Sequence, residues 1–191
     1  MEKIRKKRLG KGYWLLTFVA LFVTGFFVCH SYAEEESRVR YGFSVLGGAG
    51  DAWHNETTLT VYGFLPRADV PLHRNWDLEL EGNYSYWSIH KEHNLYFLGA
   101  NANILFKPIQ RDWGSLFLLV GGGLGYDSGG GRVKEIGGQH FGGILQAGLG
   151  FYYNLGKRLA LRIEYRFYHT SEPFRSDHGL NAHTALFGVS F

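Results

Sequence analysis

Apolar and polar residues alternate in eight separate segments of this 191-residue chain, and this alternation restricts the possible folds more than any other feature. Side chains of a β-strand point alternately to its two faces, so each segment predicts a strand with one apolar and one polar face. Residues 76–81, which read WDLELE, are the clearest example, whereas the facing of residues 57–65 is ambiguous. The eight predicted strands span residues 39–45, 57–65, 76–86, 96–106, 116–126, 141–153, 158–171 and 181–191.

The N-terminal segment has the three parts of a secretory signal peptide. Six basic residues lie in Met1–Lys11, an apolar run follows from Tyr13 to Val28, and Ser31-Tyr32-Ala33 offers small residues to signal peptidase. We therefore predict a signal peptide over residues 1–33 and one exported domain over residues 34–191. A membrane-anchoring helix is the alternative, but the apolar run is shorter than the roughly 20 residues that a span needs.

The formal charge of +3 comes from this leader. Without its six basic residues and one acid, the 20 basic and 17 acidic residues become 14 and 16, a net charge of −2. No basic surface remains that would favour nucleic acid as a partner. The single cysteine, Cys29, also lies in the leader, so the exported domain cannot form an internal disulfide.

Eight strands of this length, in a chain with 27 glycines and 17% aromatic residues, are typical of a small closed barrel. A soluble barrel turns its apolar face inward, whereas a transmembrane barrel turns it to lipid. Export favours the membrane, and so do acids at 77, 79 and 81 that can pair with Arg38, Arg40, Arg162 and Arg166 inside a narrow barrel. We predict an all-β, eight-stranded antiparallel transmembrane β-barrel in the Gram-negative outer membrane.

The C-terminal residue and the connection lengths suggest how this barrel is inserted. An ending on Phe191 resembles the signal read by the outer-membrane assembly machinery, which is therefore an expected partner. With both termini in the periplasm, connections 66–75, 107–114 and 154–157 are periplasmic, and the longest, 127–139, is external. Residues 169–171 then lie at the outer end of the seventh strand, level with the start of the eighth.

Three polar residues interrupt the apolar face at this outer end: His169, Ser171 and Asn181. A serine hydroxyl becomes a nucleophile when a histidine takes its proton, and the histidine needs a third group to hold its tautomer. Asn181 can fill that third role through its amide oxygen. The simpler interpretation is a polar cluster at the membrane interface that leads into an external loop.

The motifs His169-Thr170-Ser171 and His178-Gly179-Leu180-Asn181 resemble the signature of the lipid A 3-O-deacylase (PagL) family of outer-membrane esterases. The resemblance implies hydrolysis of the acyl ester at position 3 of lipid A, without a metal or cofactor. Ser171 is then the nucleophile, His169 the base, Asn181 the orienting group, and lipopolysaccharide of the outer leaflet the substrate. The family has Glu at the position of Asn181 and Asn at that of Glu172, which leaves open whether Glu172, Asp177 or His183 compensates.

Two other functions fit the same fold. A non-enzymatic small barrel of the adhesion or structural type would act through its external loops. An acyltransferase of the palmitoyl-transfer kind would need a hydrocarbon pocket inside the barrel, and the predicted interior is too charged for one. The sequence also leaves a homodimer open.

Overall fold

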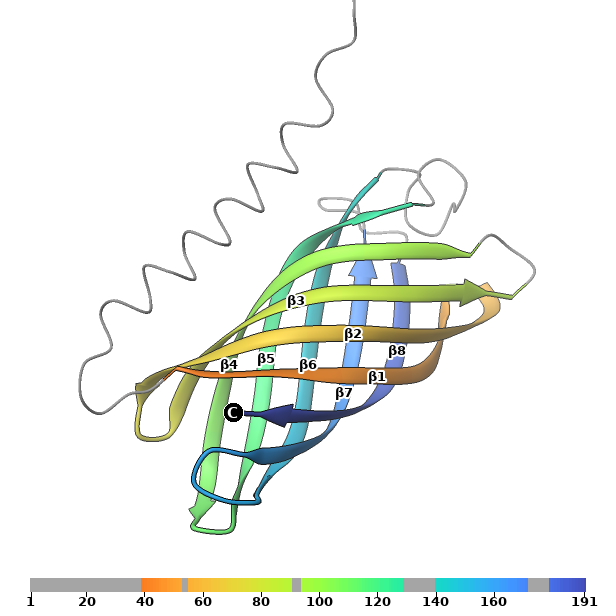
Figure 1. Cartoon of the computed structure of the whole chain (residues 1–191). Coiled ribbons are helices and arrows are strands. Elements are labelled where there is room, and N and C mark those ends of the chain that lie inside the picture. Colours follow the sequence, from red (N-terminus) through yellow and green to blue (C-terminus); the bar gives the residue numbers. More distant parts are fainter. Residues whose placement is uncertain (1–38, 53–54, 91–93, 129–139, 172–178) are drawn as a thin grey trace, which may run out of the picture. The chain divides into compact units, whose positions relative to one another are not determined.

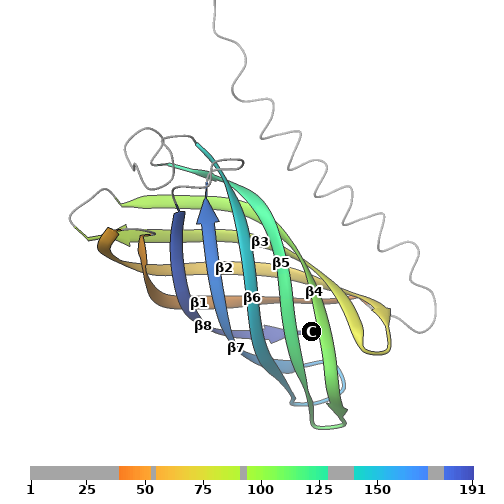
Figure 2. The same ribbon diagram turned by 180° about the vertical axis from the view of Figure 1, so that it is seen from behind.

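Eight antiparallel strands close into a barrel in which each strand pairs with the next along the chain and β8 pairs back with β1 (Figures 1 and 2). The strands are β1 (Arg40–Ala52), β2 (Asn55–His73), β3 (Trp76–Ile89), β4 (Leu95–Arg111), β5 (Gly114–Asp127), β6 (Phe141–Asn154), β7 (Ala160–Ser171) and β8 (Gly179–Ser190). This architecture confirms the predicted fold class.

The computed structural model describes residues 39–52, 55–90, 94–128, 140–171 and 179–191. The predicted signal peptide and Arg38 therefore lie outside the described residues. No helix in the described ranges has the length and apolar character needed to cross a membrane.

The largest differences from the predicted strand lengths are in β1, β2 and β4. β2 continues to His73 and β4 to Arg111, so the connections expected over 66–75 and 107–114 shrink to tight turns at 74–75 and 112–113. Proline cannot donate a ladder hydrogen bond, and Pro71 and Pro108 lie at shifts in strand register that accommodate this loss. β1 continues beyond Val45 through a glycine-rich stretch to Ala52.

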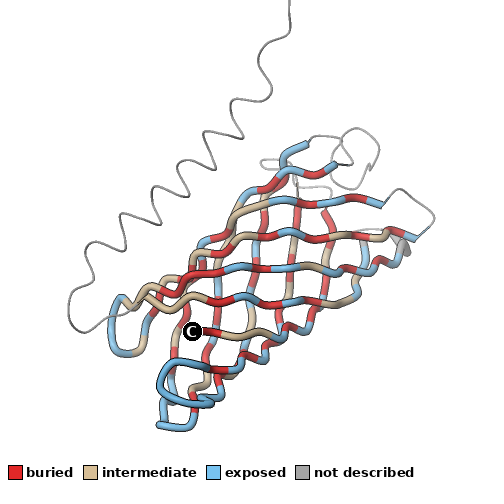
Figure 3. Tube along the Cα trace, in the orientation of Figure 1, coloured by how far each residue is buried: buried red, intermediate tan, exposed pale blue. Residues whose placement is uncertain are grey.

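Buried and exposed residues alternate along the strands of the barrel wall (Figure 3), and its two surfaces have opposite polarity. Val45, Ile163 and Phe187 point outward and are more than half exposed, whereas Arg162 and Arg166 point inward and are buried. A soluble barrel would show the reverse arrangement, so the exterior of this barrel is suited to lipid. The connections after β1, β3, β5 and β7 share one end of the barrel, and each contains residues outside the described ranges. The connections after β2, β4 and β6 share the other end.

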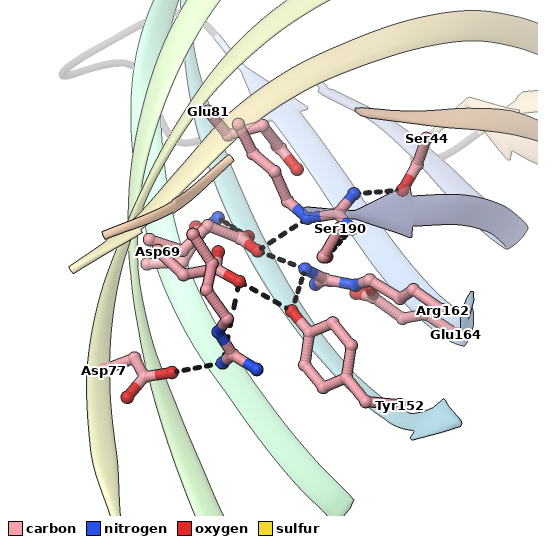
Figure 4. A network of polar contacts seen from close by, with 12 residues as sticks. Ser44, Asp69, Asp77, Glu81, Tyr152, Arg162, Glu164 and Ser190 are labelled. Carbon is pink, nitrogen blue, oxygen red and sulfur yellow. Dashed lines mark hydrogen bonds and ion pairs between the residues drawn. The ribbon is translucent and has the colours of Figure 1, made fainter. Parts of the chain in front are cut away.

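Ion pairs fill the middle of the interior (Figure 4). Arg162 pairs with Glu79 and Glu164, and Arg166 pairs with Glu81 and Glu164. The predicted pairing is therefore confirmed for Glu79 and Glu81 with the arginines of β7, and Asp77 pairs with Arg40 of β1 at 3.0 Å. Three further members of this interior group were missed because they lie in stretches predicted to be turns: Arg67, Asp69 and Lys107.

The interior becomes apolar near the end at which β7 connects to β8. Trp87, Phe97, Ile144 and Leu180 belong to one buried cluster there. Leu59, Val61 and Leu65 of β2 point into the same cluster while Tyr62 and Phe64 point outward, so β2 is apolar on both faces. This explains why its facing was ambiguous in the sequence.

Candidate active site on the outer surface of the barrel

The hairpin of β7 and β8 brings the three predicted site residues to one end of the barrel. Ser171 is the last residue of β7 and Gly179 the first of β8. His169 lies directly opposite Asn181, and Ser171 directly opposite Gly179. His169, Ser171 and Asn181 are partly exposed while Thr170 and Leu180 between them are buried, so all three point to the exterior.

His169 and Asn181 are joined by a hydrogen bond of 2.8 Å between Nδ1 and Oδ1. An amide oxygen can only accept, so Nδ1 carries the proton in this pair. In the neutral ring, Nε2 then has the free lone pair and is the atom able to take a proton. Asn181 therefore contacts the histidine that it is predicted to orient, and its role stays a prediction.

The Cε1–Nε2 edge of His169 lies over Gly179 of the neighbouring strand β8. A Cβ added to Gly179 would lie 2.7 Å from Cε1 and 3.3 Å from Nε2 of His169. Because Gly179 is the cross-strand partner of Ser171, the ring has been turned toward the level of the serine. Gly143 of β6 is the other partner of Ser171, so neither neighbouring strand puts a side chain beside the hydroxyl.

The surface next to this polar group is apolar. Leu145 on β6 lies opposite His169 and is 64% exposed, and Phe167 precedes the histidine on the same face of β7. An acyl ester likewise has a polar carbonyl group at one end and a hydrocarbon chain beyond it. The arrangement can therefore meet such a molecule at the edge of the lipid layer.

Glu172, Asp177 and His183 were left open as residues that could compensate for the differences from the family signature. Glu172 and Asp177 lie outside the described residues. His183 lies one row further from the barrel end than Asn181, where its Nδ1 contacts the Tyr165 hydroxyl at 2.5 Å and its ring packs against Phe167. His183 is therefore engaged with Tyr165 and Phe167.

The described part of the interior leaves no room for a hydrocarbon chain. The ion pairs fill the middle, the apolar cluster fills the end, and two voids beside Trp87 and Phe97 measure about 10 Å³ each. A void of this size holds about one water molecule. Within the described residues, no group of three or more His, Cys, Asp or Glu side chains is placed to hold a metal ion.

Comparison with known proteins identifies the fold but does not separate functions. The chain matches the family described as outer membrane protein beta-barrel domain over residues 18–191. No curated protein sequence is significantly similar to it.

Three solved structures show the breadth of this likeness. The outer membrane enzyme PagL aligns with a TM-score of 0.58 and 16% identity over 76% of this chain and 97% of its own. Neisserial surface protein A aligns with a TM-score of 0.57 and 14% identity over 82% of this chain and 98% of its own. Ail, the attachment invasion locus protein of Yersinia pestis, aligns with a TM-score of 0.51 and 15% identity over 82% and 98%. At these identities the likeness shows the fold alone.

Proposed function

Since this chain belongs to the outer membrane protein β-barrel domain family and lies in the outer membrane of Gram-negative bacteria, we propose that it is an esterase that hydrolyses the 3-O-linked acyl chain of lipid A. The fold is common to enzymes and to barrels with other roles, so the proposal depends on the residues of the site. It assigns Ser171 as the nucleophile, His169 as the general base and Asn181 as the residue that orients the base.

The hydrogen bond between His169 Nδ1 and Asn181 Oδ1 is the observation that carries this proposal. A histidine held through Nδ1 can take the proton of a serine hydroxyl with its free Nε2, which activates the hydroxyl for acyl transfer. The Nε2 edge of His169 lies over Gly179, the cross-strand partner of Ser171, which supports this role. Polar groups on a lipid-facing surface are costly, and a cluster with this geometry favours catalysis over a polar rim.

The reaction follows from the chemistry of these groups. Ser171 Oγ attacks the ester carbonyl carbon while its proton passes to His169 Nε2. The tetrahedral intermediate collapses, the bond to the 3-oxygen of the sugar breaks, and His169 returns the proton to that oxygen, which leaves an acyl-serine. Water then attacks the acyl-serine with His169 as base, and the products are a free fatty acid and the regenerated serine.

The location of the group supports a membrane lipid as the substrate. The site is on the exterior, beside Leu145 and Phe167, so an acyl ester of the outer leaflet can reach it without leaving the membrane. Phe191, exposed at the opposite end of the barrel, remains the residue proposed to engage the assembly machinery.

Mass spectrometry of lipid A from Gram-negative cells that express the chain tests the proposal. We expect the loss of one 3-linked hydroxyacyl chain in cells with the natural sequence and an unchanged spectrum with Ser171→Ala. Ser88→Ala is the matched control, because Ser88 is a partly exposed serine near the same end of the barrel on β3. An unchanged spectrum from correctly inserted natural protein would instead favour a barrel that acts through its external loops.

A further inference from the structure

Barrel closure brings an acidic residue from the start of the domain to the candidate site. Asp51 on β1 lies directly opposite Asn181 on β8, and Ala49 lies opposite His183. Asp51 is exposed and has the same parity as Phe43 and Val45, which face outward. Its carboxylate is therefore on the same exterior surface as Asn181 and His169.

The order of these three residues across the strands has a chemical consequence. β8 lies between β7 and β1, and Asn181 directs its amide oxygen to His169 on the β7 side. The amide nitrogen, with two N–H donors, is at the other end of the same group. Directly opposite residues have Cβ atoms about 5 Å apart, which brings a carboxylate acceptor within reach of these donors.

Asp51 is unusual for its position. Among the side chains that the structure describes, it is the only Asp, Glu, Lys or Arg on the exterior in the half of the barrel that carries the site. The described arginines and lysines lie in the interior or at the opposite end, and none pairs with it. An acid on the lipid-facing side that pairs with none of the described cations is expensive there and indicates a function by default.

We propose that Asp51 is a positioning residue for the esterase reaction, which supplies through Asn181 the negative charge that stabilises the protonated imidazole of His169. This inference rests on the proposed function. When Ser171 gives up its proton, His169 becomes a cation held by a neutral amide. A carboxylate two strands away stabilises that cation, and accepting a hydrogen bond from the amide nitrogen would let it polarise the amide oxygen toward Nδ1.

The test is a double-mutant cycle on the full-length protein in detergent micelles, with purified lipopolysaccharide as substrate and fatty-acid release as the readout. Two strand spacings separate the charges by roughly 10 Å, and at an effective dielectric constant of about 20 the loss of Asp51 lowers kcat by roughly tenfold. We expect this loss in Asp51→Asn with little change in KM, and we expect Asp51→Glu to restore most of kcat.

The second arm tests whether the effect of Asp51 passes through Asn181. In an Asn181→Glu background, a carboxylate already contacts His169, so adding Asp51→Asn should change kcat by less than about twofold. Thr58→Val, which alters the β2 neighbour of Asp51, is the control for local disturbance.

The outcomes distinguish this inference from the proposed function. If Ser171→Ala abolishes fatty-acid release while Asp51→Asn retains natural kcat, the role of Asp51 is refuted and the esterase stands. The same tenfold loss in both backgrounds also refutes it, because the effect of Asp51 would then not pass through Asn181. If the natural protein releases no fatty acid, the proposed function itself fails.

Discussion

Replacing Gly179 with alanine should disable the candidate site without unfolding the barrel. The added Cβ would lie 2.7 Å from Cε1 and 3.3 Å from Nε2 of His169, and 3.1 Å from the carbonyl oxygen of Thr170. The closest of these atoms, Cε1, belongs to the edge of a side chain on the barrel exterior, and the Thr170 carbonyl needs to shift by only a few tenths of an ångström. The imidazole can therefore rotate away from the strand, and the backbone ladder of β7 and β8 need not break.

The size of the effect follows from the distance that the ring must move. Carbon atoms in favourable contact are about 3.5–4.0 Å apart, so the ring has to retreat by roughly 1 Å. That movement stretches the 2.8 Å hydrogen bond to Asn181 and takes Nε2 away from Gly179, the cross-strand partner of Ser171. A displacement of about 1 Å in a catalytic group costs on the order of 100-fold in rate, so we expect kcat to fall by about that factor.

Fatty-acid release from lipopolysaccharide, measured beside the circular dichroism spectrum of the refolded variant, checks this expectation. Gly47→Ala is the matched control, because Gly47 also faces outward and an added Cβ there meets nothing closer than 3.8 Å. Natural activity in Gly179→Ala, combined with inactivity of His169→Ala, would refute the geometry deduced for the imidazole.

Two further predictions concern the barrel itself. Glu79→Gln leaves Arg162 without one of its two buried carboxylate partners, and breaking a buried pair costs about 3–5 kcal/mol, measurable by denaturant unfolding in lipid vesicles. A loss below about 1 kcal/mol would mean that water penetrates the interior. Val120→Arg, at a 62% exposed position in the middle of β5, should cost about 2–4 kcal/mol in the same assay if the exterior meets hydrocarbon. An unchanged unfolding free energy would show that this surface is wet.

The alternation of residues was sufficient to predict eight strands and the polarity of most of their faces. Residues that alternate along a strand lie on opposite faces of the sheet, so the apolar residues of each segment share one face. Acids on one segment and arginines on another indicate that the polar faces meet in a charged interior. The predicted ends of the strands were less accurate. Pro71 and Pro108 were interpreted as turns but lie at register shifts within β2 and β4, and the glycines after Val45 continue β1. A local pattern does not reveal that a neighbouring strand will accept such residues.

Only the tertiary structure decided which residues meet at the site. His169, Ser171 and Asn181 are close in sequence, and their shared face could be predicted from strand periodicity. Asp51 is 130 positions before Asn181, and it lies beside that residue because β1 and β8 close the barrel in one particular register. Register depends on side-chain packing and twist around the whole closed sheet, so the sequence determined the faces of the strands and the closed barrel determined their neighbours.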